Sequence, residues 1–292
     1  MNARNRWILL LLLSVATALL AFNGHPFIVN AAAPVADLER VHFGDRPVSN
    51  LFSQAEPRQA VQTSEVQYAT VNGKVITGYF AKPKTVTGPL PAVITIHEWW
   101  GLNDNIRAAT RRLAGEGYQV LAVDLYGAQT AQTPEAARQL LQQVNDNPTP
   151  AKDNLRQAYQ YLANRQKAPK VGVMGWCFGG AWSLQTALLL PTEIDATVIY
   201  YGRLVNDPAQ LRTLQMPILG IFGANDQSIP VADVRRFEET LKSLGKTVTI
   251  QIYDNAGHAF ANPSGDRYVP AAAEAAWSQT TDFLARTLKP KT

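Results

Sequence analysis

The amino-acid sequence predicts an α/β fold with a mostly parallel central sheet, helices on both of its faces and an N-terminal β-hairpin. From Pro89 onward, short apolar runs alternate with helical stretches, which is typical of a parallel sheet covered by helices. Before them, two strand-like segments flank Asn72 and Gly73, a pair that favours a tight hairpin turn. The chain has 292 residues, 46% hydrophobic and 17% charged, which suits one large globular domain with additional segments.

Eight segments have the composition of strands. The hairpin strands are expected at 64–70 and 74–81, where β-type residues precede and follow the turn. The run 92–96 is apolar apart from Thr95, as expected of a strand buried on both faces. The last segment, 247–253, alternates apolar and polar residues and therefore belongs nearer an edge. The remaining strands are expected at 120–123, 171–174, 196–201 and 218–222.

Helices are expected between these strands, where apolar residues recur with helical spacing or the segment is wholly apolar. A breaker at 145–148 separates two of them, and a long amphipathic helix closes the chain. The expected helices are 103–116, 134–144, 151–164, 181–190, 231–244 and 271–288. The domain is thus predicted to span 64–292.

The first 33 residues are typical of a secretory signal peptide. Arg4 and Arg6 precede an uncharged run over 7–22, no acidic residue occurs before Asp37, and alanines at 31–33 offer a cleavage site. An uncleaved membrane anchor is the alternative, because the run is long for a signal core and short for a span. We expect export to the periplasm or the exterior, with 34–63 forming a linker or extended arm.

The charge and cysteine content of the chain limit the classes of partner and cofactor that we expect. The formal net charge is +4 and falls to +2 when Arg4 and Arg6 leave with a signal peptide. No Lys/Arg cluster is suited to a phosphate backbone, so nucleic acid is not an expected partner. Cys177 is the only cysteine, which excludes intramolecular disulfides and a thiolate metal cluster. We expect a monomer that acts on a small molecule and needs no metal or organic cofactor.

Cys177 lies in the sequence Gly-Trp-Cys-Phe-Gly-Gly, between the strand at 171–174 and the apolar run that follows. This layout indicates a nucleophile elbow, a strained strand-to-helix turn with the reactive residue at its apex. Gly175 and Gly179 fit because side chains there would collide. A helix N-terminus would favour the thiolate of Cys177. The alternative is a buried structural cysteine in a glycine-rich turn.

Ionisable residues follow several predicted strands, and functional residues of parallel sheets gather at these strand ends. Cys177, Asp226 and His258 occur in the order nucleophile, acid, base, which is the order of the α/β-hydrolases. His258 would act as the general base, and Asp226 would orient its ring.

Other residues compete for these roles. His97 is the rival base, unless it fixes the loop of Glu98. Asp124 and Asp254 are the rivals of Asp226, although Asp254 is as well explained as a turn former. The sequence gives little support for a metal site at His97 and Glu98, because no second histidine follows at the His-Glu-x-x-His spacing.

Taken together, these segments resemble the dienelactone hydrolases (the carboxymethylenebutenolidase-like α/β-hydrolases), and the similarity covers about 65–288. The resemblance implies a triad of Cys177, Asp226 and His258, with Glu98 as a fourth residue that interacts with the resting thiol. It also implies an oxyanion hole at the backbone N–H groups of Trp99 and Phe178. The shared segments are 97–103, 124–126, 175–180, 223–226 and 257–260.

The chain departs from dienelactone-degrading members of that family at two positions. Ala128 and Asn262 stand where the resemblance places arginines that hold the substrate carboxylate. Trp100, Tyr126 and Trp176 are candidates for an apolar substrate pocket, although aromatic residues near strand ends are often core. We therefore expect an exported hydrolase of another ester or lactone. The alternative is a non-catalytic protein that binds a small lipophilic ligand.

Overall fold

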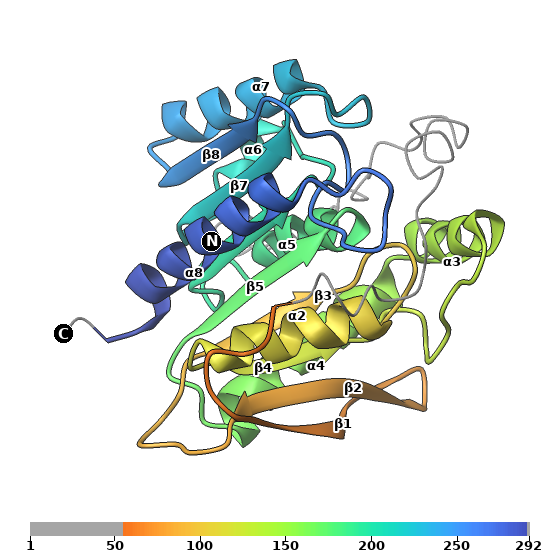
Figure 1. Cartoon of the computed structure of the whole chain (residues 1–292), viewed down its shortest axis with the longest axis vertical. Helices are drawn as coiled ribbons and strands as arrows, with labels where there is room; N and C mark the ends of the chain where they lie inside the picture. Colours follow the sequence, from red (N-terminus) through yellow and green to blue (C-terminus); the bar gives the residue numbers. More distant parts are fainter. Residues whose placement is uncertain (1–54, 291–292) are drawn as a thin grey trace, which may run out of the picture. The chain divides into compact units, whose positions relative to one another are not determined.

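The computed structural model describes residues 55–290. The expected signal peptide or anchor (1–33) and most of the expected linker (34–63) lie outside this range. The described residues form a sheet of eight strands in the order β1-β2-β4-β3-β5-β6-β7-β8 (Figure 1). The strands are β1 (Val61–Val71), β2 (Lys74–Pro83), β3 (Ala92–Ile96), β4 (Gln119–Val123), β5 (Val171–Trp176), β6 (Ala196–Tyr200), β7 (Ile218–Gly223) and β8 (Val248–Tyr253).

The sheet is mostly parallel, as predicted. β1 pairs antiparallel with β2, and β2 pairs antiparallel with β4. All neighbouring pairs from β4 to β8 are parallel. The predicted hairpin is present, but its first strand begins at Val61, so the end of the expected linker is already part of the sheet. β8 lies at the edge that its alternating sequence predicts.

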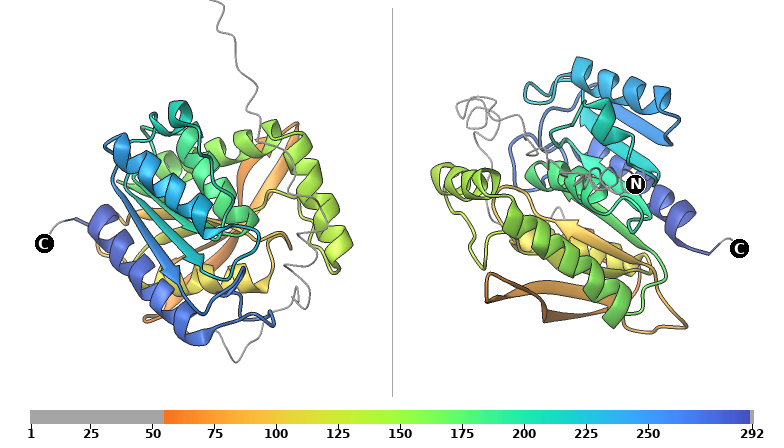
Figure 2. Two further views of the ribbon diagram at one scale, coloured as in Figure 1. Left: turned by 90° about the horizontal axis from the view of Figure 1, so that it is seen from above. Right: turned by 180° about the vertical axis from the view of Figure 1, so that it is seen from behind.

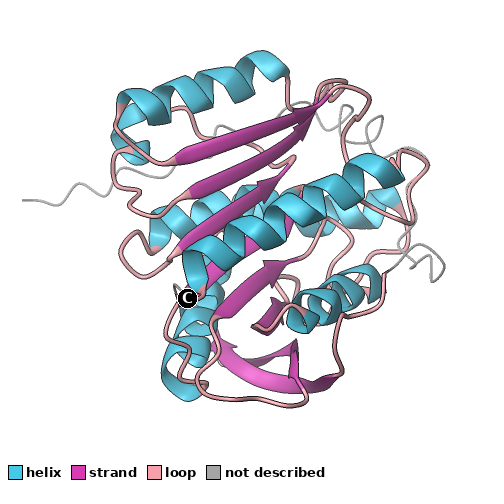
Figure 3. Ribbon diagram, turned by 60° about the vertical axis from the view of Figure 1, so that its left-hand side comes forward, coloured by secondary structure: helices cyan, strands magenta, loops and turns pink. Residues whose placement is uncertain are grey.

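Helices cover both faces of this sheet (Figures 2 and 3). Helices α2 and α8 contact β4 to β7 from one face, whereas α4, α5 and α7 contact the strands from the other. Two buried hydrophobic clusters accordingly lie on the two sides of the sheet. The helices are α2 (Asp104–Gly115), α3 (Pro134–Asp146), α4 (Thr149–Gln160), α5 (Phe178–Leu189), α6 (Pro208–Leu211), α7 (Val231–Ser243) and α8 (Pro270–Leu288).

The helices differ from expectation in two places. The helix expected over 151–164 begins at Thr149 and passes into a π-helical turn, Tyr161–Arg165. The short helix α6 was not expected. It has a single turn, capped by Asp207, whose side chain accepts a 2.9 Å hydrogen bond from the N–H of Ala209, and one turn is too short to show periodicity. Between residues 55 and 290, no helix combines the length and apolar character that a membrane span needs.

Candidate active site

Cys177 sits at the junction of β5 and α5 in a strained backbone conformation. Its φ is +55° and its ψ is −112°, a region that non-glycine residues seldom occupy. The Cys177 N–H donates to the carbonyl of Tyr200 at 3.0 Å, and its own carbonyl accepts from the N–H of Ala181 at 3.0 Å. The neighbouring strand and the first turn of α5 thus hold the residue from both sides.

The glycines of this turn are required by close backbone contacts. A Cβ atom on Gly175 would lie 2.4 Å from the carbonyl oxygen of Gly179. A Cβ atom on Gly179 would lie 2.2 Å from the carbonyl oxygen of Ile96 at the end of β3. These distances bear out the steric reason inferred from the sequence, and they bring the elbow against the strand that leads to Glu98.

Cys177, His258 and Asp226 form one hydrogen-bonded chain. The Cys177 sulfur lies 3.1 Å from Nε2 of His258, and Nδ1 of His258 lies 2.8 Å from Oδ2 of Asp226. The other oxygen of Asp226 accepts N–H bonds from Ser228 at 2.8 Å and Ile229 at 3.0 Å. All three members of the chain are buried, so the carboxylate is fixed and the ring is aligned between it and the sulfur.

The charges around His258 favour its protonated form. Burial lowers the pKa of His258, but the negative charges of the Cys177 thiolate and the Asp226 carboxylate raise it, together with the hydrogen bonds that the ring donates to both groups. The net effect raises the pKa of His258 from 6.5 to about 10. The geometry therefore suits an ion pair between a thiolate and an imidazolium.

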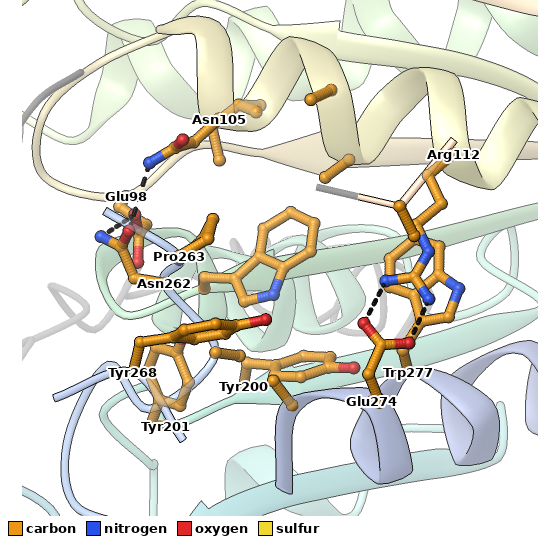
Figure 4. A pocket seen from close by; sticks show the side chains of 17 residues that line it. Glu98, Asn105, Arg112, Tyr200, Tyr201, Asn262, Pro263, Tyr268, Glu274 and Trp277 are labelled. Atoms are coloured by element: carbon orange, nitrogen blue, oxygen red, sulfur yellow. Dashed lines mark hydrogen bonds and ion pairs between the residues drawn. The ribbon is translucent and has the colours of Figure 1, made fainter. Parts of the chain in front are cut away.

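Glu98 is buried at the end of β3, and a chain of amides reaches it. Nδ2 of Asn262 donates to Oε2 of Glu98 at 3.0 Å. Oδ1 of Asn262 accepts from Nδ2 of Asn105 at 3.2 Å (Figure 4). The same oxygen accepts from the N–H of Ser264 at 2.9 Å. The donors on Oδ1 fix the Asn262 amide so that its N–H faces Glu98, which favours the ionised carboxylate.

The sequence interpretation missed Asn105 and Ser264. Asn105 lies 157 positions before Asn262 in the chain, and nothing in its helical context distinguishes it from a surface amide.

His97 has the structural role that the sequence left open. The N–H of Leu125 donates to Nε2 of His97 at 3.2 Å, so this nitrogen is the acceptor. Nδ1 must then carry the proton, and it donates to the carbonyl of Glu98 at 2.6 Å. Burial also lowers the pKa of His97. The neutral ring thus ties the ends of β3 and β4 together and holds the Glu98 loop in place.

Neither rival carboxylate is bonded to His258. Asp124 accepts the N–H of Tyr126 at 2.8 Å and also that of Ala128, so it closes the turn after β4. Asp254 is exposed, and its carbonyl accepts a 3.2 Å bond from the side chain of Asn225. Asp226 is the carboxylate that the fold brings to His258.

Of the three aromatic residues expected in a substrate pocket, one lines the cavity at Glu98 and two do not. Trp176 lines a cavity together with Glu98, whereas Trp100 and Tyr126 are not part of that lining. Both are buried instead: Trp100 packs against Trp99, and the ring of Tyr126 packs between His97 and Phe178. Trp176 thus lines this cavity, whereas Trp100 and Tyr126 pack among other aromatic side chains, and their place in a substrate pocket stays a prediction.

The residues expected at the oxyanion hole flank the elbow. Phe178 is the first residue of α5, so its N–H lies at the helix N-terminus. Trp99 lies in the turn that the N–H of Gly101 closes on the carbonyl of Glu98 at 3.2 Å. Among residues 55–290, no cluster of three or more His, Cys, Asp or Glu side chains could hold a metal ion.

Comparison with known proteins covers nearly the whole described domain. The profile of the dienelactone hydrolase family matches residues 76–288. A carboxymethylenebutenolidase homologue from Methylorubrum extorquens is 31% identical over 253 residues, which cover 82% of this chain and 86% of that protein. A second, from Saccharolobus solfataricus, is 31% identical and covers 75% of this chain and 96% of its own.

Solved structures agree with this result. A dienelactone hydrolase homologue from Klebsiella pneumoniae is 28% identical, with a TM-score of 0.70 over 78% of this chain and 100% of that one. A bacterial brefeldin A esterase is 18% identical and has a TM-score of 0.63 over 86% of this chain and 84% of its own. At that identity, the likeness to the esterase concerns the fold alone.

Proposed function

The chain belongs to the dienelactone hydrolase family, and from that premise we propose that it cleaves its substrate through an acyl-cysteine intermediate on Cys177. Family membership makes the protein a hydrolase of the ester or lactone type, built on the α/β-hydrolase fold. The observation that carries the proposal is the buried chain from Cys177 Sγ through His258 to Asp226, with contacts of 3.1 and 2.8 Å.

The first half of the reaction transfers the acyl group. The Cys177 thiolate attacks the substrate carbonyl carbon, and the carbonyl electron pair moves onto oxygen. The N–H groups of Trp99 and Phe178 stabilise this oxyanion. When the carbonyl re-forms, the carbon–oxygen bond to the alcohol breaks, and Nε2 of His258 gives its proton to the departing oxygen. A thioester remains on Cys177, and the imidazole is neutral.

The second half hydrolyses the thioester. Neutral His258 takes a proton from water, and the hydroxide attacks the thioester carbon. Collapse of this intermediate releases the carboxylic acid and restores the thiolate beside the imidazolium. Asp226 keeps its hydrogen bond to Nδ1 throughout, which presents Nε2 to the sulfur and stabilises the imidazolium.

Glu98 controls the resting state of the nucleophile in this proposal. Its carboxylate lies in the loop that packs against the elbow, and a negative charge there disfavours a second negative charge on sulfur. The hydrogen bond that Asn262 donates to Glu98 supports the proposal, because a donor at the carboxylate favours its charged form. Glu98→Gln should therefore speed the alkylation of Cys177 at neutral pH, yet slow ester turnover.

We further propose that the substrate is uncharged. Ala128 has no side chain that could hold a carboxylate, and Asn262 uses its amide N–H for Glu98. Replacing both residues by arginine should raise kcat/KM for dienelactone relative to a neutral enol lactone of the same size. A wild-type preference for dienelactone over such neutral analogues would contradict this part.

Export and a monomeric state complete the proposal. The basic start, apolar core and alanines of residues 1–33 support export. The test is intact-mass analysis of the native protein after cell fractionation. A large amount of full-length chain in washed soluble cytosol would refute it. Size-exclusion chromatography with light scattering tests the monomer.

The decisive experiment traps the intermediate. Full-length protein is mixed with 4-nitrophenyl acetate, quenched in acid and digested, and mass spectrometry should find the acetyl group on the Cys177 peptide. Cys177→Ala should show neither acetylation nor turnover. Turnover that persists in this variant would remove the acyl-cysteine mechanism and leave the hydrolase class in place.

A lipophile-binding protein without activity is the second candidate, because the cavity beside Glu98 has aromatic walls. The assembled triad favours the enzyme, since binding alone has no use for an aligned nucleophile and base. Binding of neutral aromatic compounds without hydrolysis of any ester would favour the binding protein.

A further inference from the structure

A cavity lies between α2, α8 and the loop that follows His258 (Figure 4). It is a partly open hollow, and the space free of protein atoms in it, open solvent included, amounts to about 670 Å³. Glu98, Asn105 and Asn262 stand at one end and Arg112 with Glu274 at the other. The space between them is available to a small molecule.

The walls of this cavity have the shape of a slot for a flat apolar group. Aromatic side chains from β5, the end of β6, α8 and the loop line it, and small alanines on the two helices and the loop leave space between them. Such walls bury apolar surface and offer ring faces for stacking. The aromatic lining residues are Trp176, Tyr200, Tyr201, Tyr268 and Trp277, and the alanines include Ala108, Ala109, Ala261 and Ala273.

The charges at the cavity select against an anion. Arg112 is engaged by Glu274 through two hydrogen bonds of 3.0 and 2.5 Å. Its guanidinium also lies over the ring of Trp277, 4.4 Å from the centroid. Because Arg112 is already paired with Glu274, it offers an anion no free countercharge, and an ionised carboxylate at Glu98 would repel a negatively charged ligand.

The cavity adjoins the catalytic chain through its own lining residues. Trp176 immediately precedes Cys177. The ring of Tyr201 lies 5.2 Å from the ring of His258, and Glu98 stands in the loop that packs against the elbow. A group bound in the cavity would therefore contact residues that adjoin Cys177 and His258, although neither of these two side chains is itself part of the lining.

We propose that this cavity binds the acyl group of the substrate and selects uncharged acyl groups that carry an aromatic ring. The inference rests on the proposed function and names its substrate class. Helices α2 and α8 enclose the slot, which suits the part of the substrate that stays on Cys177. The alcohol must leave first and needs a path to solvent.

Filling the slot tests this assignment. Ala109→Leu and Ala273→Leu add side-chain volume from α2 and α8 respectively. Each should lower kcat/KM for 4-nitrophenyl phenylacetate at least tenfold more than it lowers kcat/KM for 4-nitrophenyl acetate. Ala275→Leu is the matched control, because Ala275 is exposed on the same helix as Ala273. Thermal unfolding of each variant confirms that it folds, and Ala273→Val is the smaller replacement if leucine is not tolerated.

A binding measurement separates the cavity from the chemistry. In full-length Cys177→Ala protein, the neutral amide 2-phenylacetamide should change tryptophan fluorescence, because Trp176 and Trp277 line the slot. Adding Ala273→Leu should weaken this binding at least tenfold, whereas phenylacetate should bind poorly throughout. If the proposed function is wrong but the cavity assignment is right, 2-phenylacetamide will still bind, although the wild-type protein hydrolyses no ester.

Two outcomes would overturn the assignment. One is an equal effect of the leucine replacements on the acetate and phenylacetate esters. The other is unchanged binding of 2-phenylacetamide when the slot is filled.

Discussion

Replacing Asp226 by asparagine should disable the site by turning His258 into the wrong tautomer. Oδ1 of Asp226 accepts N–H bonds from Ser228 and Ile229 at 2.8 and 3.0 Å. An asparagine must keep its oxygen there, so its NH₂ group faces Nδ1 of His258. Nδ1 then has to accept a hydrogen bond from this NH₂ group, so the ring proton moves to Nε2, the nitrogen that faces Cys177. A neutral ring in that state cannot take the thiol proton, and we expect kcat/KM to fall by about 10³ to 10⁴.

The pH profile gives a second measure of the same change. The rise in the pKa of His258 from 6.5 to about 10 corresponds to about 5 kcal/mol of net stabilisation of the imidazolium. The charges of Asp226 and Cys177 supply this stabilisation against the effect of burial. Without the carboxylate, His258 loses its proton at lower pH. The alkaline limb of kcat/KM should therefore move from near pH 10 toward neutrality.

The assay is hydrolysis of 4-nitrophenyl acetate by purified full-length protein across the pH range, with active sites counted by alkylation. Asp254→Asn is the matched control, because Asp254 is the exposed carboxylate in the turn before His258, and it should retain wild-type activity. If Asp226→Asn kept kcat/KM within threefold of wild type, with an unmoved alkaline limb, the assigned role of Asp226 would be wrong.

Three further predictions concern the loops around the site. Burial holds the folded-state pKa of His97 below 6.5, so its contribution to stability is present above pH 6.5 and lost as the pH falls. The free energy of unfolding, measured in urea at several pH values, should fall more steeply below pH 6.5 for the wild type than for His97→Gln, by up to about 1.4 kcal/mol per pH unit. Equal pH dependence of the two proteins would refute this. Asn262→Asp places a second carboxylate against Glu98 and should cost about 1–3 kcal/mol of stability. The same variant should raise the pKa of Glu98, visible as a shifted pH profile of Cys177 alkylation, and an unshifted profile would argue against the contact. Gly179→Ala forces a Cβ to within 2.2 Å of the Ile96 carbonyl and should destabilise the fold by about 3 kcal/mol, as thermal unfolding will show; a wild-type midpoint would contradict the steric argument.

Much of the architecture was predictable because strands β3 to β7 are buried on both faces. Segments such as Ala92–Ile96 are almost wholly apolar, and their alternation with helices leaves few other sheets possible. The elbow was predictable for a local reason, since Gly175 and Gly179 surround Cys177 in six consecutive residues. Helix α6 was missed because a single capped turn has no period.

The parts of the site that were missed depend on contacts between distant segments. Asn105 on α2 reaches Asn262 only because the fold brings this helix next to the loop that follows β8. Trp100 and Tyr126 could not be assigned to pocket or core, because composition does not reveal the side of the loop to which a ring turns. The role of His97 likewise depended on which N–H group meets its ring, and that group belongs to Leu125 on the next strand.

The position of β8 has a consequence for how activity is lost. Within residues 55–290, β8 lies at the edge of the sheet and pairs with β7 alone, and the loop that follows it carries His258. Edge elements open locally at lower free energy than the centre of a sheet. Mild denaturant should therefore detach the loop that carries His258, while Cys177, in the turn after the central strand β5, keeps its strained conformation. Esterase activity would then disappear before circular dichroism reports unfolding, and during refolding it would mark the docking of β8.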